Sequence, residues 1–386
     1  MVREREQGLG ADGSAGPRNE GARGTKAGAS WWRGAWRQPS GRLAPQAAVA
    51  WMAALAVLTL LWASAQGAYA IAPAQLLHML GQWLSGQGGG AAAAGQELVL
   101  LHIRLPRLLL GVVAGAGLGL AGALMQGLFR NPLADPGLIG VSSGAALAAA
   151  FTIVVGALWL PGVPMGLGSG ALAVAAFGGG ACVTVVIYLL AQTQGGTRVG
   201  LMLLAGIAIN ALAGAGLGYL SYVSSDEQLR NLQLWLMGSL GQSRWSTVLL
   251  VGSVVLLCAA VAQRLARPLN ALALGEAQAQ LLGVPVERSK RLAVVVTALA
   301  VGAVTSATGI IGFIGLVAPH GVRLIAGPDH RVVLPCSALL GAALVVGADA
   351  LARTVVQPAE LPLGVLTALV GVPLFLWMLR QFRSGL

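Results

Sequence analysis

The chain has 386 residues, of which 56% are hydrophobic and 10% are charged. Soluble domains have about a quarter of their residues charged, so this composition excludes an ordinary water-soluble domain and indicates an integral membrane protein. The formal net charge of +11 does not indicate a nucleic-acid partner, because the basic residues are scattered between apolar runs instead of lying together on one face.

The first 46 residues differ in composition from the rest of the chain. They contain eight Lys or Arg and four Asp or Glu among Gly, Ala and Ser, a composition typical of a disordered tail. The apolar run that begins at Ala47 is longer than the apolar region of a signal peptide, so we expect it to be a retained first helix. The predicted domains are a tail over 1–46 and a transmembrane domain over 47–386.

Ten apolar runs follow, each near the roughly 20 residues that cross a membrane as a helix. They lie at 47–66, 106–128, 137–160, 168–191, 199–222, 246–264, 291–308, 310–326, 332–352 and 363–380. The run at 310–326 is the shortest and contains Pro319, His320 and Arg323. The predicted fold class is an all-α membrane protein with ten transmembrane helices, and an even number of helices places both termini on one side.

Basic loop residues predict which side that is, because cytoplasmic loops carry an excess of Lys and Arg. With the N-terminus in the cytoplasm, the inside loops hold eleven basic residues and the outside loops hold five. The inside set is Arg130, Arg198, Arg264, Arg267, Arg288, Lys290, Arg291, Arg323, Arg331, Arg380 and Arg383. The outside set is Arg104, Arg107, Arg230, Arg244 and Arg353. The count predicts that both termini are cytoplasmic.

Two of the runs carry glycine at helical spacing. One has Gly111, Gly115 and Gly119, and the other has Gly214 and Gly218. Such stripes let helix backbones approach closely, so both predict tight packing within the helix bundle.

The centres of the runs are nearly free of ionisable residues, whereas ion-coupled transporters commonly place acids or bases there. No P-loop, no nucleophile elbow (GxSxG in a strand–turn–helix context) and no HExxH motif is present, and the two lysines, Lys26 and Lys290, lie in no phosphate-binding setting. The cysteines and histidines have no metal-ligand spacing. Asp349 and Arg353 are four residues apart and predict an ion pair on one helix face, which is compatible with contact to a partner. The sequence therefore predicts no catalytic residue and no metal, and it places the energy source on another subunit.

One charged segment, residues 270–291, separates two apolar runs and reads NALALGEAQAQLLGVPVERSKR. Leu274, Ala277 and Leu281 follow i, i+3, i+7 spacing and predict one apolar helix face. Glu276 and Gln280 lie beside that face.

Further along the same segment, Gly283 is expected to end the helix and Pro285 to begin a short second turn. Glu287 falls early in that turn and Lys290 falls late, as the helix dipole favours. An amphipathic helix–turn–helix of this kind fits a groove on a soluble partner. The pattern alone is equally compatible with a solvated loop on the membrane surface.

Four long motifs stand in the order and at the spacing of a known family. They are IRLPRLLLGVVAGAGLGLAGALMQGLFRNPLADPGLIGVSSGA (103–145), LALGEAQAQLLG (272–283), GFIGLVAPHGVRLIAGPDHRVVLP (312–335) and ELPLGVLTALVGVPLFLW (360–377). On these motifs the chain resembles, over about 47–383, the FecCD-type permeases. These are the membrane subunits of type II ABC importers for vitamin B12, haem and ferric siderophores.

The resemblance implies an assembly in the bacterial inner membrane. Two copies of the permease form a homodimer around one pathway, two cytoplasmic subunits bind ATP and Mg²⁺, and a periplasmic binding protein delivers the substrate. The permease itself binds no cofactor. The segment 270–291 matches the coupling helices that press on the ATPase, and the residues that match are Leu274, Glu276, Ala277, Gln280, Leu281 and Gly283.

The resemblance also implies roles for residues at the loops. Arg104, Arg107 and Arg353 match arginines that meet acidic residues of the binding protein, and exposed arginines are suited to bidentate contacts with carboxylates. Anchoring in lipid headgroups is the alternative interpretation. Asn131 and Leu133 match a cytoplasmic gate.

The second gate element is expected at 196–200, and the resemblance places the fifth run and 225–240 along the pathway. The C-terminal sequence ADALARTVVQPAELPLGVLTALVGVPLFLW looks most like the haem permeases, so haem is the expected cargo, with vitamin B12 or a ferric siderophore as the alternative. An ion-coupled secondary transporter, and a membrane enzyme or scaffold, are the competing classes.

Overall fold

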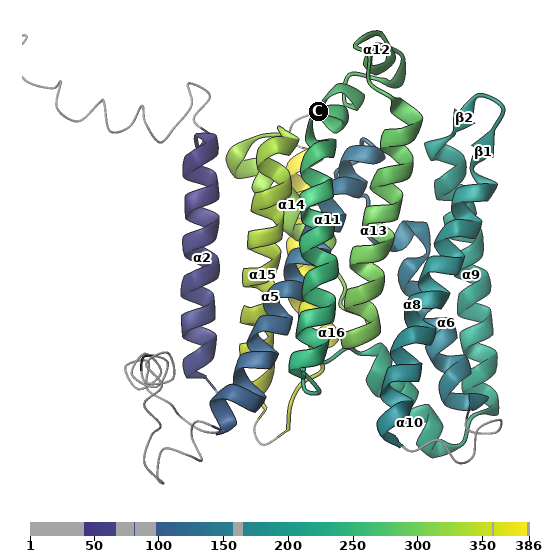
Figure 1. Cartoon of the computed structure of the whole chain (residues 1–386), viewed down its shortest axis with the longest axis vertical. Coiled ribbons are helices and arrows are strands. Elements are labelled where there is room, and N and C mark those ends of the chain that lie inside the picture. Colours follow the sequence, from purple (N-terminus) through teal and green to yellow (C-terminus); the bar gives the residue numbers. More distant parts are fainter. Residues whose placement is uncertain (1–41, 67–80, 82–97, 157–164, 357–358, 384–386) are drawn as a thin grey trace, which may run out of the picture.

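The computed structural model describes residues 42–66, 81, 98–156, 165–356 and 359–383. Within these residues, one helix corresponds to each of the ten predicted runs (Figure 1). The helices are α2 (Pro45–Ala65), α5 (Leu105–Leu128), α6 (Val141–Val154), α8 (Met165–Leu190), α9 (Val199–Val223), α11 (Trp245–Leu272), α13 (Val286–Thr308), α14 (Ile314–Ala326), α15 (His330–Thr354) and α16 (Leu363–Arg383). Most of the predicted tail, residues 1–41, lies outside the described residues, and Pro45 already belongs to α2.

Seven helices of the described chain are long and apolar enough to cross a membrane. The shorter apolar helices are α6, α14 and the segment Leu363–Trp377 of α16. One 3-10 turn, η2 (Pro136–Ile139), precedes α6, and residues 157–164 of the predicted third run lie outside the described residues. The all-helical membrane fold is therefore confirmed, and ten complete crossings remain a prediction.

The eighth helix is short because a non-helical segment precedes it. Gly309 ends α13 with φ of 71° and Phe313 precedes α14 with φ of 66°, so the backbone between them is not helical. Helix α14 then has 13 residues, which is about 20 Å at 1.5 Å per residue. The predicted run began at residue 310, four residues too early.

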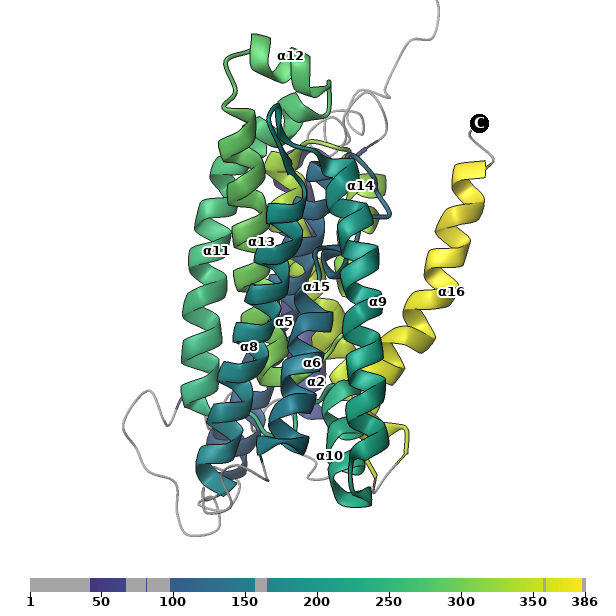
Figure 2. The same cartoon turned by 90° about the vertical axis from the view of Figure 1, so that its right-hand side faces the viewer.

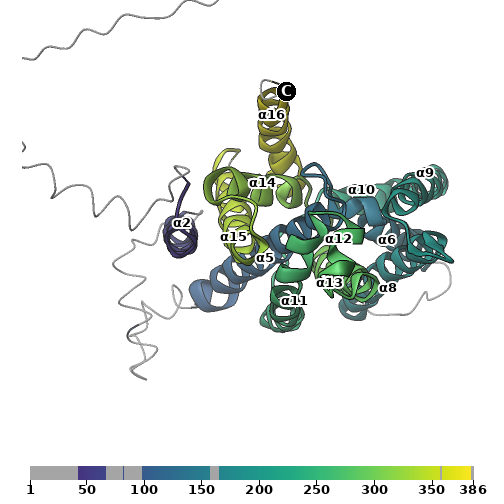
Figure 3. The same cartoon turned by 90° about the horizontal axis from the view of Figure 1, so that it is seen from above.

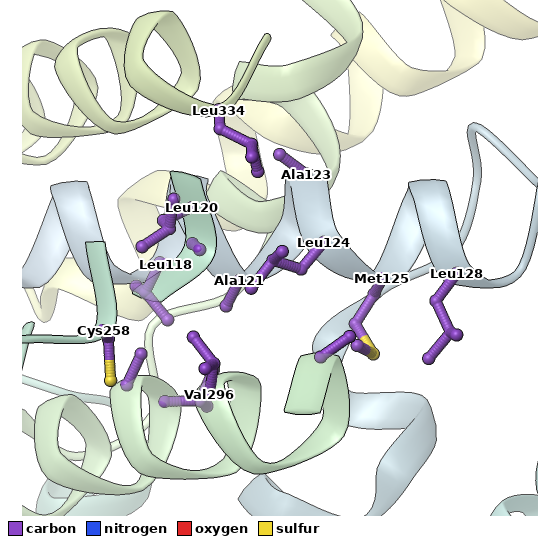
Figure 4. Packing of buried hydrophobic residues seen from close by; sticks show 14 of the residues in the cluster. Leu118, Leu120, Ala121, Ala123, Leu124, Met125, Leu128, Cys258, Val296 and Leu334 are labelled. Carbon is purple, nitrogen blue, oxygen red and sulfur yellow. The ribbon is translucent and has the colours of Figure 1, made fainter. Parts of the chain in front are cut away.

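Helix α5 lies at the centre of the bundle and is surrounded by α11, α13, α14 and α15 (Figure 3). Figure 4 shows its side chains Leu118 and Ala121 on the side of Cys258 from α11 and Val296 from α13, and Ala123 near Leu334 of α15. Because α5 is buried on most of its faces, its sequence is apolar all around the helix instead of amphipathic.

The glycine stripe of α5 packs as predicted. A Cβ atom at Gly115 would collide with the backbone of Gly341, and one at Gly119 would collide with Ser337, both on α15. The stripe of α9 makes no such contact among the described residues, since apart from the local backbone of α9 none of their atoms lies within 4 Å of a Cβ built at Gly214 or Gly218. The predicted tight packing is confirmed for α5, and for α9 it stays a prediction, since its stripe meets no other helix among the described residues.

The connections gather at the two ends of the bundle. One end carries the short helix α12 (Glu276–Leu281) and the hairpin of β1 (Gln192–Thr193) and β2 (Gly196–Thr197), and we call it the α12 end. The start of α2 and the end of α16 lie at this end (Figures 1 and 2), as an even number of crossings requires. The opposite, α10 end carries α10 (Asp226–Leu236) and the π-helical turn η1 (Leu100–Arg104) that leads into α5.

Candidate functional site

The three arginines predicted to meet a partner lie at the α10 end. Arg107, in the first turn of α5, donates from Nε and Nη2 to the carboxylate of Asp349 on α15, at 2.9 to 3.1 Å. Its Nη1 and Nη2 also donate to the two carboxylate oxygens of Glu360 at 3.0 and 2.8 Å. Two intrachain carboxylates therefore use nearly all of the five N–H donors of this guanidinium.

The other two arginines are also enclosed. Arg353 donates from Nε to Asp349 at 3.0 Å, which confirms the predicted ion pair, and from Nη1 to the carbonyl of Gln66 at 3.1 Å. Arg104 is 6% exposed and donates to the carbonyl of Ser64 at 3.0 Å. The expected exposure of these arginines is wrong, because the last carbonyls of α2 and the buried Asp349 need donors. Their docking role remains a prediction.

Glu360 is the accessible member of this cluster, which sequence reasoning did not single out. Its side chain is 48% exposed, whereas that of Asp349 is 3% exposed. The hydrogen bond from Arg107 lowers the pKa of Glu360 below its ordinary value of 4.5, against a smaller opposing effect of burial. Position 360 opens the last of the four family motifs, and that was the only signal in the sequence that could have pointed to it.

The predicted coupling segment forms a short helix that projects from the α12 end (Figure 2). Leu274 is 65% and Leu281 is 89% exposed, and Ala277 between them is exposed too. Gln280 is exposed, and Gly283, with φ of 77°, follows the end of the helix as predicted. The prediction of one helix face is therefore correct only for Ala277 and Leu281, because Leu274 lies in the turn before Gly275, whose φ of 115° separates it from α12. All three side chains are exposed in the described part of the chain.

The charged residues of this segment are arranged differently from the prediction. Helix α13 begins at Val286 and continues without a break as a long helix, so the short second turn does not exist as a separate element. Lys290 consequently lies near the start of a helix, where the dipole does not favour it. Instead, its Nζ forms ion pairs with Glu276 at 2.7 Å and Glu287 at 3.1 Å.

The predicted gate residues belong to two separate connections near the α12 end. Asn131 and Leu133 follow α5, and the amide of Leu133 donates to Oδ1 of Asn131 at 2.9 Å. The second predicted element, 196–200, contains β2 and the start of α9. Asn131 is exposed and Leu133 is half-buried, so the motif is a tight polar turn at the surface of the subunit.

A cavity of about 270 Å³ lies where the helical structure is interrupted, between α5, η2, α13 and the break before α14. Its lining is mainly apolar and includes Leu118, Val301 and Phe313, with Ser142 and Asp135 as polar groups. Burial raises the pKa of Asp135, although its carboxylate accepts a hydrogen bond from the amide of Gly137 at 2.7 Å. The sequence analysis did not identify this carboxylate.

Comparison with known proteins gives a consistent result. The sequence model of the FecCD transport family matches residues 54–381. The hemin transport system permease protein HmuU of Yersinia pestis is 49% identical over 291 residues, which are 74% of this chain and 85% of that protein. The cobalamin import system permease protein BtuC of Halobacterium salinarum is 44% identical over 74% of each chain.

Two further relatives agree with these. The vitamin B12 import system permease protein BtuC of Klebsiella pneumoniae is 40% identical over 79% of this chain and 86% of that protein. A solved ABC transporter assigned to the metal-chelate type, in an inward-facing conformation, superposes with a TM-score of 0.73 at 29% identity, over 87% of this chain and 99% of that one. The chain therefore belongs to the FecCD transport family and is a multi-pass permease subunit of an ABC importer of the cytoplasmic membrane.

Proposed function

We propose that this permease imports haem, handed over by a periplasmic binding protein and driven by ATP hydrolysis on partner subunits. The observation that supports haem is the graded similarity to relatives: 49% identity to the hemin permease against 44% and 40% to two cobalamin or vitamin B12 permeases. Vitamin B12 or a ferric siderophore is the alternative cargo.

The proposed orientation puts the α12 end in the cytoplasm and the α10 end in the periplasm. The excess of basic residues in the loops of the α12 end supports this orientation. In the proposed assembly, two copies of the chain surround one pathway and each contacts a cytoplasmic ATPase subunit. No P-loop is present in this sequence, which supports ATP binding on those partners and not here.

The proposed contact with the ATPase is the exposed face of Leu274, Ala277 and Leu281. An apolar surface that projects beyond the membrane is normally covered by a partner, and a short exposed helix with a leucine at its end fits a groove. Gln280 and Gly283 border the same face, and Glu276 approaches it from the α13 side. ATP-driven closure of the ATPase subunits would then move α12.

Truncation of the exposed leucine tests this contact. Leu281→Ala should lower ATP-driven uptake and weaken ATPase association, because each CH₂ removed from a covered apolar surface costs about 0.8 kcal/mol. Leu257→Ala is the matched control, since Leu257 is 63% exposed on the long helix α11. Equal uptake and equal ATPase association in the two variants would remove α12 from the interface.

The cargo is tested by uptake into proteoliposomes that are loaded with ATP and contain the complete transporter with its binding protein. Haem, cobalamin and a ferric siderophore are compared under the same conditions. We expect haem to accumulate, and accumulation of cobalamin alone would overturn the proposed cargo. Uptake by the isolated subunit under an ion gradient, without ATPase subunits, would instead favour an ion-coupled transporter.

A further inference from the structure

The enclosed ammonium of Lys290 joins three segments of the chain. Its side chain is 2% exposed, and its Nζ donates to Glu276 of α12 and Glu287 of α13. It also donates to the backbone carbonyl of Thr197 in β2 at 2.7 Å. A lysine has three N–H donors, so these three acceptors satisfy it. No single one of the three segments would supply that set.

The hairpin is also held directly by α13. The amide of Thr197 donates to Oε2 of Glu287 at 2.9 Å, while Oε1 of the same carboxylate accepts from Lys290. Gly196 has φ of 103°, and a Cβ there would lie 2.7 Å from Oε1 of Glu287. Glycine at this position lets the hairpin backbone come close enough for both hydrogen bonds.

We propose that Lys290 is a positioning residue for transport, which ties α12 to the β1–β2 hairpin so that a displacement of α12 moves the hairpin with it. The inference rests on the proposed function, in which α12 receives the motion of the ATPase and 196–200 is a gate element. Charge-assisted hydrogen bonds are shorter and stronger than neutral ones. A single ammonium that bonds to all three segments is therefore a short and stiff link between them.

Lys290→Met is a suitable variant, because it keeps an unbranched side chain of similar length and removes the charge together with the three N–H donors. The two carboxylates that lose their partner are partly open to water, with Glu276 39% and Glu287 43% exposed. They can be hydrated in the variant, so the fold is expected to survive. Arg288→Met is the matched control, because Arg288 is exposed and its substitution removes the same charge two residues away from Lys290.

The first measurement is amide hydrogen exchange of the reconstituted complex, with and without a non-hydrolysable ATP analogue. In the wild type, peptides covering 274–283 and 192–198 should both change their exchange on nucleotide binding. In Lys290→Met the response of 274–283 should remain and that of 192–198 should disappear. Arg288→Met should behave as the wild type in both segments.

The second measurement is the ratio of haem taken up to ATP hydrolysed in proteoliposomes. Lys290→Met should lower this ratio severalfold, because a displacement of α12 no longer moves the hairpin, while ATP hydrolysis continues. A hairpin response that survives in Lys290→Met, or an unchanged ratio, would overturn the link. Absence of any response at 274–283 in the wild type would instead overturn the coupling role of α12, and the link with it.

Discussion

Arg107 is the residue on which the docking hypothesis depends most, and most of its N–H donors already form hydrogen bonds within the chain. Asp349 is buried beneath it, so we expect a carboxylate from a binding protein to approach Arg107 on the exposed side, where Glu360 lies. Glu360 is therefore expected to compete with the partner for the same guanidinium. In this hypothesis Arg107 becomes available to the binding protein only when the carboxylate of Glu360 moves away from it.

Glu360→Gln should consequently strengthen binding-protein association. We expect a two- to fivefold gain in affinity, because a partly exposed ion pair is worth up to about 1 kcal/mol, and the gain should shrink at high salt. Affinity of the binding protein for the reconstituted permease measures it. Glu227→Gln, which removes one negative charge from the same end, is the charge-matched control. Weaker association in Glu360→Gln would show that Glu360 orients Arg107 instead of competing for it.

The same carboxylate predicts an acid-dependent loss of stability. Because the hydrogen bond from Arg107 lowers the pKa of Glu360 from 4.5, its stabilising contribution is present above pH 4.5 and is lost as the pH falls through the folded-state pKa. The temperature of the thermal unfolding midpoint in detergent should therefore decrease as the pH is lowered below 4.5. The decrease should be smaller in Glu360→Gln. Identical pH profiles for the two proteins would contradict this assignment.

At the scale of the helices, the sequence predicted the positions of all ten elements, because a long apolar run is a local property. The beginning of α14 was missed because its cause is not local. A Cβ at Gly309 would collide with the carbonyl of Trp235 on α10, and Gly364 of α16 packs against Ile310. The break is therefore fitted to two helices that are distant along the chain.

The features of the candidate sites also divide into those set by neighbouring residues, which were predictable, and those set by residues far along the chain, which were not. The exposed helix α12 was predictable, since glycines bound it and its apolar spacing lies within eight residues. The enclosure of Arg107 was not predictable, because Asp349 and Glu360 lie 242 and 253 residues away along the chain. The burial of Lys290 was missed for the same reason, since Thr197 is 93 residues away. The sequence therefore predicted the local pair of Asp349 and Arg353, but not the partners of Arg107 and Lys290 that lie far along the chain.

The contact between α5 and α15 makes a prediction about these two elements. Gly119→Ala should destabilise the isolated subunit by about 1 to 3 kcal/mol, because its Cβ would overlap the backbone at Ser337. Gly214→Ala is the matched control on α9, where the Cβ has open space and alanine slightly favours the helix. Thermal unfolding in detergent measures both, and equal midpoints would contradict the close α5–α15 packing.

Among the described residues of the whole molecule, the ion pairs lie only at the two ends of the helix bundle. Arg107 and Arg353 hold the α10 end, and Lys290 holds the α12 end. Between them, the helices are joined by apolar packing around α5. Helix α9 lies at the edge of this packing, with Tyr219 67% and Tyr222 87% exposed, and α16 stands apart from it in Figure 2. This arrangement is compatible with a second copy and a pathway on that side.

A bulky residue on α9 tests whether this face belongs to the pathway. Gly218→Trp should leave the thermal stability of the isolated subunit unchanged, because a Cβ there meets no side chain or neighbouring helix of the described structure within 4 Å, and should strongly reduce uptake. Gly178→Trp, on α8 and equally open, is the control and should preserve uptake. Equal uptake in both variants would contradict a pathway along the fifth helix.

The enclosure of Lys290 has one practical consequence. The chain contains only two lysines, so few primary amines compete for a chemical reagent. Cyanate can carbamylate Lys290 only after its three acceptors have released it, since an ammonium bonded on all sides is protected from attack. The rate at which the peptide containing Lys290 is carbamylated would therefore report how often Lys290 separates from its three acceptors during turnover. This measurement needs no label introduced into the protein.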